Sequence, residues 1–120
     1  MNAGPLYLAL IYLHPGQQEA LRRYENLALP VFRRHGGRFE RILSPAPAPG
    51  GGPDPDAPDE IHLLRFEMPD GLDAVRRDPE MVALVPLREA VVRTALLARV
   101  DGAAGALLPS QQLYPGLRSG

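Results

Sequence analysis

Three histidines are the residues of this chain best suited to move a proton near neutral pH. His14 follows an apolar run, His35 lies near the end of a predicted helix, and His62 lies inside a predicted strand. An imidazole has an ordinary pKa of about 6.5, so each is a candidate general base. Half-buried structural histidines are common in the same places, and the sequence leaves both roles open. We place His62 and His14 among the candidate catalytic residues and expect His35 to act at the helix end.

The spacing of the three histidines does not favour metal binding. No two of them lie at helical or strand-alternate spacing, so we expect no metal site. The chain has no cysteine, which excludes disulfides, thiolate ligands and a thiol nucleophile. It also has no serine–histidine–aspartate phrase, no phosphate-binding glycine loop and no dinucleotide fingerprint. We therefore expect no cofactor.

Arg65 is the most suggestive of the basic residues, all 13 of which are arginine. Strand alternation places it with Ile61 and Leu63 on one face of a predicted strand. A guanidinium inside a strand is costly unless an anion pairs with it. That anion is either Glu40 or Glu67, or the carboxylate or enolate oxygen of a small ligand. Arg65 therefore joins the candidate catalytic residues.

Four further residues could line a site for a small apolar or anionic ligand. Tyrosines supply aromatic walls and hydroxyl groups, although they more often pack in a core. Arginines on strands supply planar donors for acidic groups. The four candidate ligand-binding residues are Tyr12, Tyr24, Arg41 and Arg93.

The first third of the chain predicts a strand, a helix and a second strand. Residues 6–13 are almost all apolar, which is typical of a strand in the middle of a sheet. Residues 17–35 carry one apolar stripe at helical spacing. Two glycines, 36 and 37, end the helix, and residues 38–43 alternate as a strand near the sheet edge.

The remaining chain predicts a loop, a strand, helical segments and a last strand. Residues 44–58 are rich in proline and glycine and predict an irregular connection. Residues 60–68 alternate as a strand, and Asp70 can cap a short helix that carries Leu72 and Val75. Asp78 and Pro79 predict a cap and the start of a helix that runs to residue 89 with an interruption at Pro86, and residues 91–100 form the last strand. We expect one domain over residues 1–101 and a C-terminal tail over residues 102–120.

This order of elements, β-α-β-β-α-β, predicts a ferredoxin-like α+β fold with a four-stranded antiparallel sheet. Right-handed crossovers place both helical segments on one face of that sheet. The other face carries apolar side chains from every strand, which a monomer would expose to water. We therefore expect a homodimer in which the open sheet faces pack together.

Three phrases of the sequence carry a family resemblance: ALPVFRRHGGRF at residues 28–39, EIHLLRFEM at residues 60–68 and DPEMVALVPLREAVV at residues 78–92. Over residues 6–101 the chain resembles the dimeric α+β-barrel proteins. Within them it is most similar to a domain-of-unknown-function branch related to antibiotic-biosynthesis monooxygenases. The resemblance implies two ferredoxin-like subunits whose sheets enclose a barrel. Other relatives are isomerases and cyclases, and the branch itself implies no agreed reaction.

The charge and hydropathy of the chain argue against nucleic-acid and membrane partners. A formal net charge of -1 gives no reason to expect nucleic acid or an anionic membrane. The longest apolar run is far shorter than the ~20 residues of a membrane span, so we expect a cytoplasmic protein. Our leading hypothesis is a small-molecule enzyme, such as a cofactor-free monooxygenase, an isomerase or a cyclase. The alternative is a noncatalytic dimeric protein that binds a ligand or has a structural role.

Overall fold

The computed structural model describes residues 4–45, 47, 49–52 and 54–101. The predicted tail over residues 102–120 lies outside the described residues. In chain order the elements are β1 (Leu6–Leu13), α1 (Gln18–Arg34), β2 (Gly37–Leu43), β3 (Glu60–Phe66), α2 (Gly71–Arg77), α3 (Pro79–Ala83), α4 (Val85–Val91) and β4 (Val92–Arg99).

The four strands form one antiparallel sheet in the order β2-β3-β1-β4. This is the topology of a ferredoxin-like α+β fold, so the predicted fold class is confirmed. β1 lies inside the sheet and β2 lies at an edge, as the apolar and charged patterns of these two strands predict. The described residues between β2 and β3 form only turns and bends.

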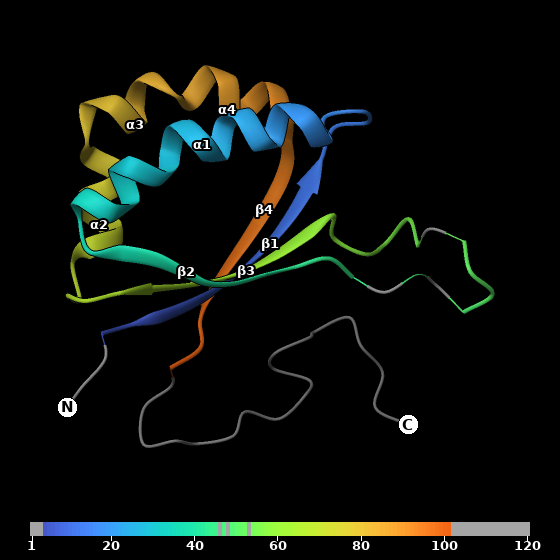
Figure 1. Ribbon diagram of the computed structural model, residues 1–120, viewed down its shortest axis with the longest axis horizontal. Coiled ribbons are helices and arrows are strands. Elements are labelled where there is room, and N and C mark those ends of the chain that lie inside the picture. The colour runs from blue at the N-terminus through green and yellow to red at the C-terminus, as the bar shows by residue number, and fades with distance from the viewer. Residues whose placement is uncertain (1–3, 46, 48, 53, 102–120) are drawn as a thin grey trace.

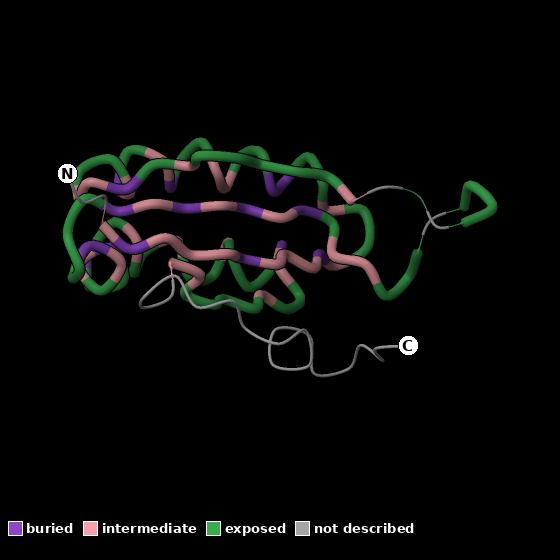
Figure 2. The backbone as a smooth tube through the Cα atoms, turned by 90° about the horizontal axis from the view of Figure 1, so that it is seen from below, coloured by how far each residue is buried: buried purple, intermediate pink, exposed green. Residues whose placement is uncertain are grey.

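All four helices lie on one side of the sheet (Figure 1). Buried residues alternate with half-buried ones along β3 (Figure 2), and the buried Leu64 and Phe66 belong to the core under the helices. The core has two parts, one at each end of α1. The first part holds Leu13, Ala20, Leu21 and Val91, and the second holds Val31, Leu64, Phe66 and Val75.

Two consecutive glycines turn the chain from α1 into β2. Gly36 has a φ of 77°, the left-handed conformation predicted for a glycine after a helix. Gly37 lies against Phe66, since a Cβ atom added to Gly37 would come within 2.6 Å of the phenylalanine ring. The turn therefore brings β2 closely over the core.

The helix predicted over residues 79–89 is interrupted near Pro86, as predicted, and forms two short helices, α3 and α4. Leu84 separates them, and Pro86 lies in the first turn of α4, where its missing N–H is not needed. The predicted cap at Asp78 is confirmed, because its carboxylate accepts a hydrogen bond from the backbone N–H of Glu80 at 2.9 Å. The predicted cap at Asp70 is wrong, since its side chain makes no capping hydrogen bond.

The opposite face of the sheet carries no helix in the described part of the chain (Figure 1). Ile61, Leu63 and Arg65 alternate with the buried residues of β3 and therefore point to this open face. Leu43 and Leu96 are 42% and 53% exposed. None of the described helices has the length and apolar character needed to cross a membrane.

Candidate functional site

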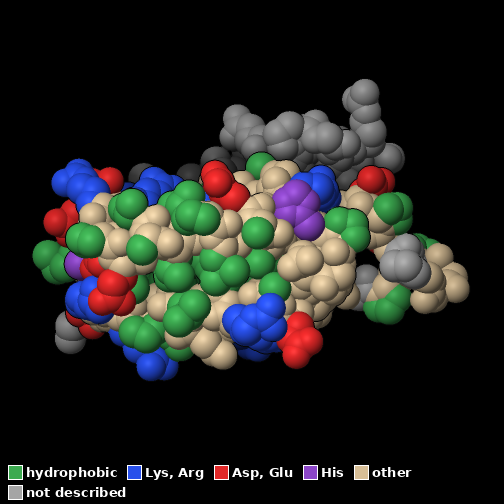
Figure 3. Space-filling view, turned by 90° about the horizontal axis from the view of Figure 1, so that it is seen from above, with side chains coloured by type: hydrophobic (Ala, Val, Ile, Leu, Met, Phe, Trp, Pro, Cys, Tyr) green, Lys and Arg blue, Asp and Glu red, His purple; other side chains and the backbone are tan. Residues whose placement is uncertain are grey.

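A cavity of about 330 Å³ lies between the helices and the covered face of the sheet. α1 contributes Tyr24, Ala28 and Phe32 to its wall, and β3 contributes His62 and Leu64. Most of the lining side chains are apolar, and the volume falls in the range of roughly 300–1,000 Å³ that small-molecule sites occupy. Figure 3 views the helical side of the molecule, where apolar side chains gather and charged ones lie mostly around the margin.

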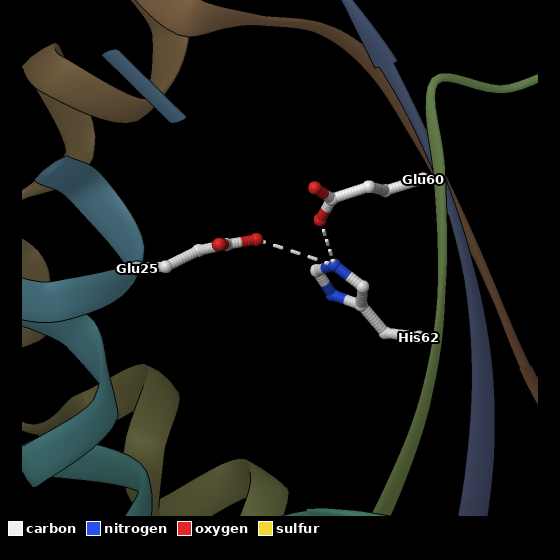
Figure 4. A group of neighbouring side chains, drawn as sticks. All are labelled: Glu25, Glu60 and His62. Atoms are coloured by element: carbon white, nitrogen blue, oxygen red, sulfur yellow. Dashed lines mark hydrogen bonds and ion pairs between the residues drawn. The ribbon is translucent and has the colours of Figure 1, made fainter. Parts of the chain in front are cut away.

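His62 meets two carboxylates at the wall of this cavity (Figure 4). Its Nε2 atom lies 2.7 Å from Oε1 of Glu60 and 3.3 Å from Oε2 of Glu25. A carboxylate accepts, so Nε2 carries the hydrogen in the contact with Glu60. Strand alternation places residues 60 and 62 on the same face of β3, and α1 brings Glu25 over them.

Two neighbours hold this cluster in place. The ring of His62 lies edge-on to Phe39, with the ring centroids 5.2 Å apart. Arg22, one turn before Glu25 on α1, binds the second oxygen of Glu60 through Nη1 at 2.5 Å. The same Arg22 nitrogen lies 3.3 Å from Oε1 of Glu25. These contacts fix the orientation of both carboxylates.

One oxygen of the cluster is left without a donor. Oε2 of Glu25 is buried and has no hydrogen-bond partner among the described residues. It lies at ion-pair distance from His62 without the geometry of a hydrogen bond. A buried carboxylate oxygen without a donor is costly, so this oxygen has unused binding capacity.

The cluster shifts the ionisation of His62 and Glu60 in opposite directions. Burial alone would lower the pKa of His62, but the neighbouring carboxylates of Glu25 and Glu60 outweigh it and raise that pKa. Burial alone would raise the pKa of Glu60, but hydrogen bonds with His62 and Arg22 lower it. The two carboxylates therefore make the imidazole of His62 more basic than a free one.

Tyr24 also presents its hydroxyl group in this region. Its Oη atom lies 3.7 Å from the sulfur of Met81 on α3. Burial raises the pKa of the Tyr24 hydroxyl, and the charge of Arg88 opposes part of that rise. Tyr24 is therefore a neutral polar group in a largely apolar wall.

The structure brings together only two of the predicted site residues, His62 and Tyr24, which both line the cavity. His14 lies elsewhere, at the end of β1, where its Nε2 donates to the carbonyl of Glu89 at 3.2 Å. Arg65 points to the open face of the sheet. There its Nε binds Glu40 at 3.0 Å and its Nη1 binds the carbonyl of Gly4 at 2.8 Å. Arg65 and His62 therefore do not meet in one cavity.

The other three predicted ligand-binding residues also lie outside the cavity lining. The guanidinium of Arg93 lies 5.5 Å from the centre of the Tyr12 ring, a cation–π contact. Arg41 is exposed on the edge strand, opposite Leu63 of the open face. The structure thus accounts for Tyr12 and Arg93 as a mutual contact.

The sequence interpretation missed Glu25, Glu60 and Arg22. Glu60 could have been found, because alternation in the strand places it beside His62 on the buried face. Glu25 and Arg22 come from a helix far away in the chain, and no local pattern links them to β3. The three histidines do not converge: His35 binds Asp78, away from the partners of His14 and His62. The group that could hold a metal ion is instead Glu25, Glu60 and His62, whose ligand atoms all lie within 4.8 Å of one another.

Solved structures show what this chain resembles, whereas no family model and no curated protein matches its sequence. A protein of unknown function from Rhodopseudomonas palustris is 25% identical, with a TM-score of 0.67 over 90% of this chain and 86% of that one. A NIPSNAP family protein of unknown function from Agrobacterium tumefaciens is 14% identical, with a TM-score of 0.59 over 83% of this chain and 89% of that one. A DABB family protein with a ferredoxin-like fold from Mesorhizobium loti is 16% identical, with a TM-score of 0.57 over 82% and 96%. These likenesses support the ferredoxin-like α+β fold and no particular reaction.

Proposed function

We propose that this protein is an enzyme that binds a small, largely apolar molecule in the helix–sheet cavity and moves a proton on it with His62. The observation that carries this proposal is a histidine, His62, that lies in the wall of a mostly apolar cavity of about 330 Å³ and pairs with the carboxylate of Glu60. An apolar cavity with a few convergent polar groups is the usual form of a small-molecule site.

The pairing assigns a role to each ring nitrogen of His62. Nε2 donates its hydrogen to Glu60, and the hydrogen bond found for the His62 ring among the described residues uses this nitrogen and not Nδ1. Nδ1 is therefore the atom that accepts a proton from a bound ligand and later returns it. Glu60 stabilises the imidazolium formed in between, and Arg22 keeps the Glu60 carboxylate in position.

Two reaction classes need only this proton transfer. Removing a proton from a phenol, or from a carbon beside a carbonyl, leaves an electron-rich anion. Returning the proton to another carbon of the anion completes an isomerisation. Attack of the anion on a carbonyl carbon of the same molecule breaks the C=O π bond, and return of the proton from His62 to that oxygen completes a cyclisation. A cofactor-free monooxygenase would use the same anion with dioxygen as the oxidant.

Two arginines in the cavity lining favour a ligand that also carries an acidic group. Arg76 of α2 and Arg88 of α4 both contribute to the cavity wall, and neither forms an ion pair within the described part of the chain. A guanidinium without a partner can bind a carboxylate with two parallel hydrogen bonds. Apolar carboxylic acids with a carbonyl or phenol group therefore fit the site best.

A thermal-shift screen of small phenols, ketones and aromatic carboxylic acids tests the binding part of this proposal. We expect compounds of this class to raise the melting temperature, with the shift reduced in a variant that fills the cavity, Ala28→Leu. Tyr12→Phe is the matched control, since Tyr12 lies outside the cavity lining. A panel with no stabilising compound, or a hit unaffected by Ala28→Leu, would contradict the proposal.

We also propose that two copies of the chain pack through their open sheet faces. Leu8 and Leu63 pair in register near the middle of the sheet, and Leu63 points to the open face. Burying such a face in a second copy removes apolar surface from water. Light scattering after size exclusion should give a dimer mass for the natural chain and a monomer mass for Leu63→Glu. A monomeric natural chain would overturn this proposal.

One observation supports the alternative of a noncatalytic ligand-binding or structural protein. Arg65 is bound by Glu40 and by the carbonyl of Gly4, as expected for an arginine with a structural role. The two functions differ in what happens to a bound ligand. A noncatalytic protein would bind the same compounds without exchanging their acidic C–H hydrogens for deuterium in heavy water.

A further inference from the structure

The cluster of Glu25, Glu60 and His62 has the composition and convergence of a cation site. Two of the side chains come from β3 and the third comes from α1, and all point toward one another (Figure 4). Their ligand atoms, one imidazole nitrogen and two carboxylate oxygens, lie within 4.8 Å of one another. Imidazole and carboxylate together are the common ligands of divalent transition metals.

Two of the three spacings within the cluster, those from His62 to each carboxylate, are close to the spacings of a coordination shell, and the third lies within 4.8 Å. Ligand atoms bound at about 2.1 Å to a tetrahedral or octahedral ion are separated by roughly 3.0–3.4 Å. Nε2 of His62 lies 2.7 Å from Oε1 of Glu60 and 3.3 Å from Oε2 of Glu25. A small outward movement of Glu60 would bring both pairs to the spacing of a coordination shell.

Oε2 of Glu25 gives an independent reason to expect a ligand. This oxygen is buried, and it accepts no hydrogen bond from the described residues. The other oxygen of Glu25 faces Arg22, so the two oxygens of this carboxylate have different surroundings. A cation between Glu25 and His62 would supply the partner that the buried oxygen lacks.

Within the cluster, one oxygen of each glutamate faces His62 and the other faces Arg22. Arg22 binds Oε2 of Glu60 and thereby leaves Oε1 directed at His62. A fixed outer partner of this kind orients the inner oxygen of a metal-binding carboxylate. The cluster also lines the cavity through Glu25 and His62, so coordination positions beyond the three protein ligands face the space for a small molecule.

We propose that Glu25, Glu60 and His62 bind one divalent transition-metal ion, such as Zn²⁺ or Mn²⁺, at the wall of the helix–sheet cavity. The ion takes the place of the Nε2 hydrogen between His62 and Glu60, so in the metal-bound form Nδ1 of His62 carries the imidazole hydrogen and the ion, in place of Nδ1, acts on the ligand. Three protein ligands with open positions are typical of catalytic rather than structural metal sites. The inference deepens the proposed function, on which its catalytic meaning rests, because an ion there would polarise the oxygen of a ligand in the cavity.

Titration of chelator-treated protein with Zn²⁺ in a calorimeter tests the site. We expect one equivalent of Zn²⁺ to bind per chain. Loss of an outer hydrogen-bond partner usually lowers metal affinity by roughly 10- to 100-fold, and loss of a metal ligand in Glu25→Gln or His62→Gln should lower it further. His35→Gln is the matched control, because His35 pairs with a carboxylate outside the cavity. Absence of saturable binding, or binding unchanged in both site variants, would overturn the proposal.

A second measurement uses the natural chain and so does not depend on how the variants fold. Mn²⁺ is paramagnetic and broadens the resonances of nearby nuclei. We expect substoichiometric Mn²⁺ to broaden the ring signals of His62 before those of His14 and His35. Equal broadening of all three would contradict a site at His62.

The two proposals fail in different ways. If neither ion binds while phenols still stabilise the protein through the cavity, the metal inference fails and the proposed function stands. If the ions bind but no small molecule stabilises the protein with or without them, the metal site stands and the proposed function fails.

Discussion

Two histidine–carboxylate clusters connect α1 to the rest of the molecule, and they differ in how completely their carboxylates are used. At the end of α1, Oδ2 of Asp78 is bound by His35 and Arg34, both at 2.8 Å, and Oδ1 accepts from the N–H of Glu80. At the middle of α1, His62 pairs with Glu60 while one oxygen of Glu25 has no donor among the described residues.

The difference lies in what surrounds each cluster. The Asp78 cluster joins the C-terminal end of α1 to the first turn of α3, so its bonds hold two helices and cap one of them. The His62 cluster lies against an apolar cavity, where a ligand can reach it. A histidine paired with a carboxylate thus connects two helices in one place and is a candidate reactive group in the other.

The largest expected effect that separates the clusters is on proton transfer. His62→Gln should slow deuterium exchange of a cavity ligand by roughly 10²- to 10⁴-fold, the usual contribution of a general acid–base group. His35→Gln should leave the exchange rate unchanged, because His35 is bound to Asp78 away from the cavity lining. Proton NMR of a stabilising compound in heavy water measures both rates. Equal slowing in the two variants would show that the clusters do not differ in this way.

For thermal stability, we expect the Asp78 cluster to matter more than the His62 cluster. Asp78→Asn should lower the melting temperature by several degrees, because it weakens two charged hydrogen bonds and the cap of α3 together. Glu25→Gln should change the melting temperature less, since it removes a charge whose second oxygen has no donor. Thermal unfolding followed by circular dichroism gives both values. A larger loss in Glu25→Gln would mean that the cavity cluster is the stronger structural joint.

The stability difference between the natural chain and Asp78→Asn should depend on pH in the acidic range. The hydrogen bond from His35, the bond from the N–H of Glu80 and the charge of Arg34 lower the pKa of Asp78 to about 2. Its folded-state pKa lies below its unfolded one, so its stabilisation is present above about pH 4 and is lost as the pH falls toward 2. The difference in urea midpoint between the two proteins should therefore shrink from pH 5 to pH 2. A constant difference over that range would assign the effect to the cap alone.

In the chelator-treated protein, the stabilisation that His62 contributes should decrease as the pH rises. The pKa of His62 is raised in the fold, so its stabilisation is full below the unfolded value of about 6.5 and is lost as the pH rises through the folded value. The groups that face this imidazole are Glu25 and Glu60, with Arg22 behind them. The urea midpoint of His62→Gln should therefore approach that of the natural chain above neutral pH. An imidazole signal of His62 that titrates at or below 6.5 would contradict this direction.

Sequence reasoning predicted the fold because the signals of the fold are local. The apolar run of β1, the helical stripe of α1 and the glycines after it each specify their own element, and their order specifies the sheet. The cap at Asp78 was predictable for the same reason, since aspartate followed by proline is a helix-start signal.

The candidate site was less predictable because it depends on contacts between distant segments. His62 was predicted, but Glu25 reaches it only through the packing of α1 on β3. Arg65 and His62 were both predicted as catalytic residues, yet the sequence itself argues against their acting on one ligand. Strand alternation places residues 62 and 65 on opposite faces, and the structure keeps them there.

Arg65 gives the smallest expected effect and the test of the open face. Its ion pair with Glu40 is partly exposed, and such pairs contribute little to stability. Arg65→Gln should therefore leave the melting temperature, the ligand shift and the exchange rate of a monomeric background, Leu63→Glu, almost unchanged. In the natural chain the same substitution should weaken the proposed dimer, because the open face would bring the Arg65 pair into the contact with a second copy. Loss of ligand binding in Arg65→Gln on the monomeric background would instead show that the ligand lies on the open face, and the comparison of the two clusters would then no longer locate the site.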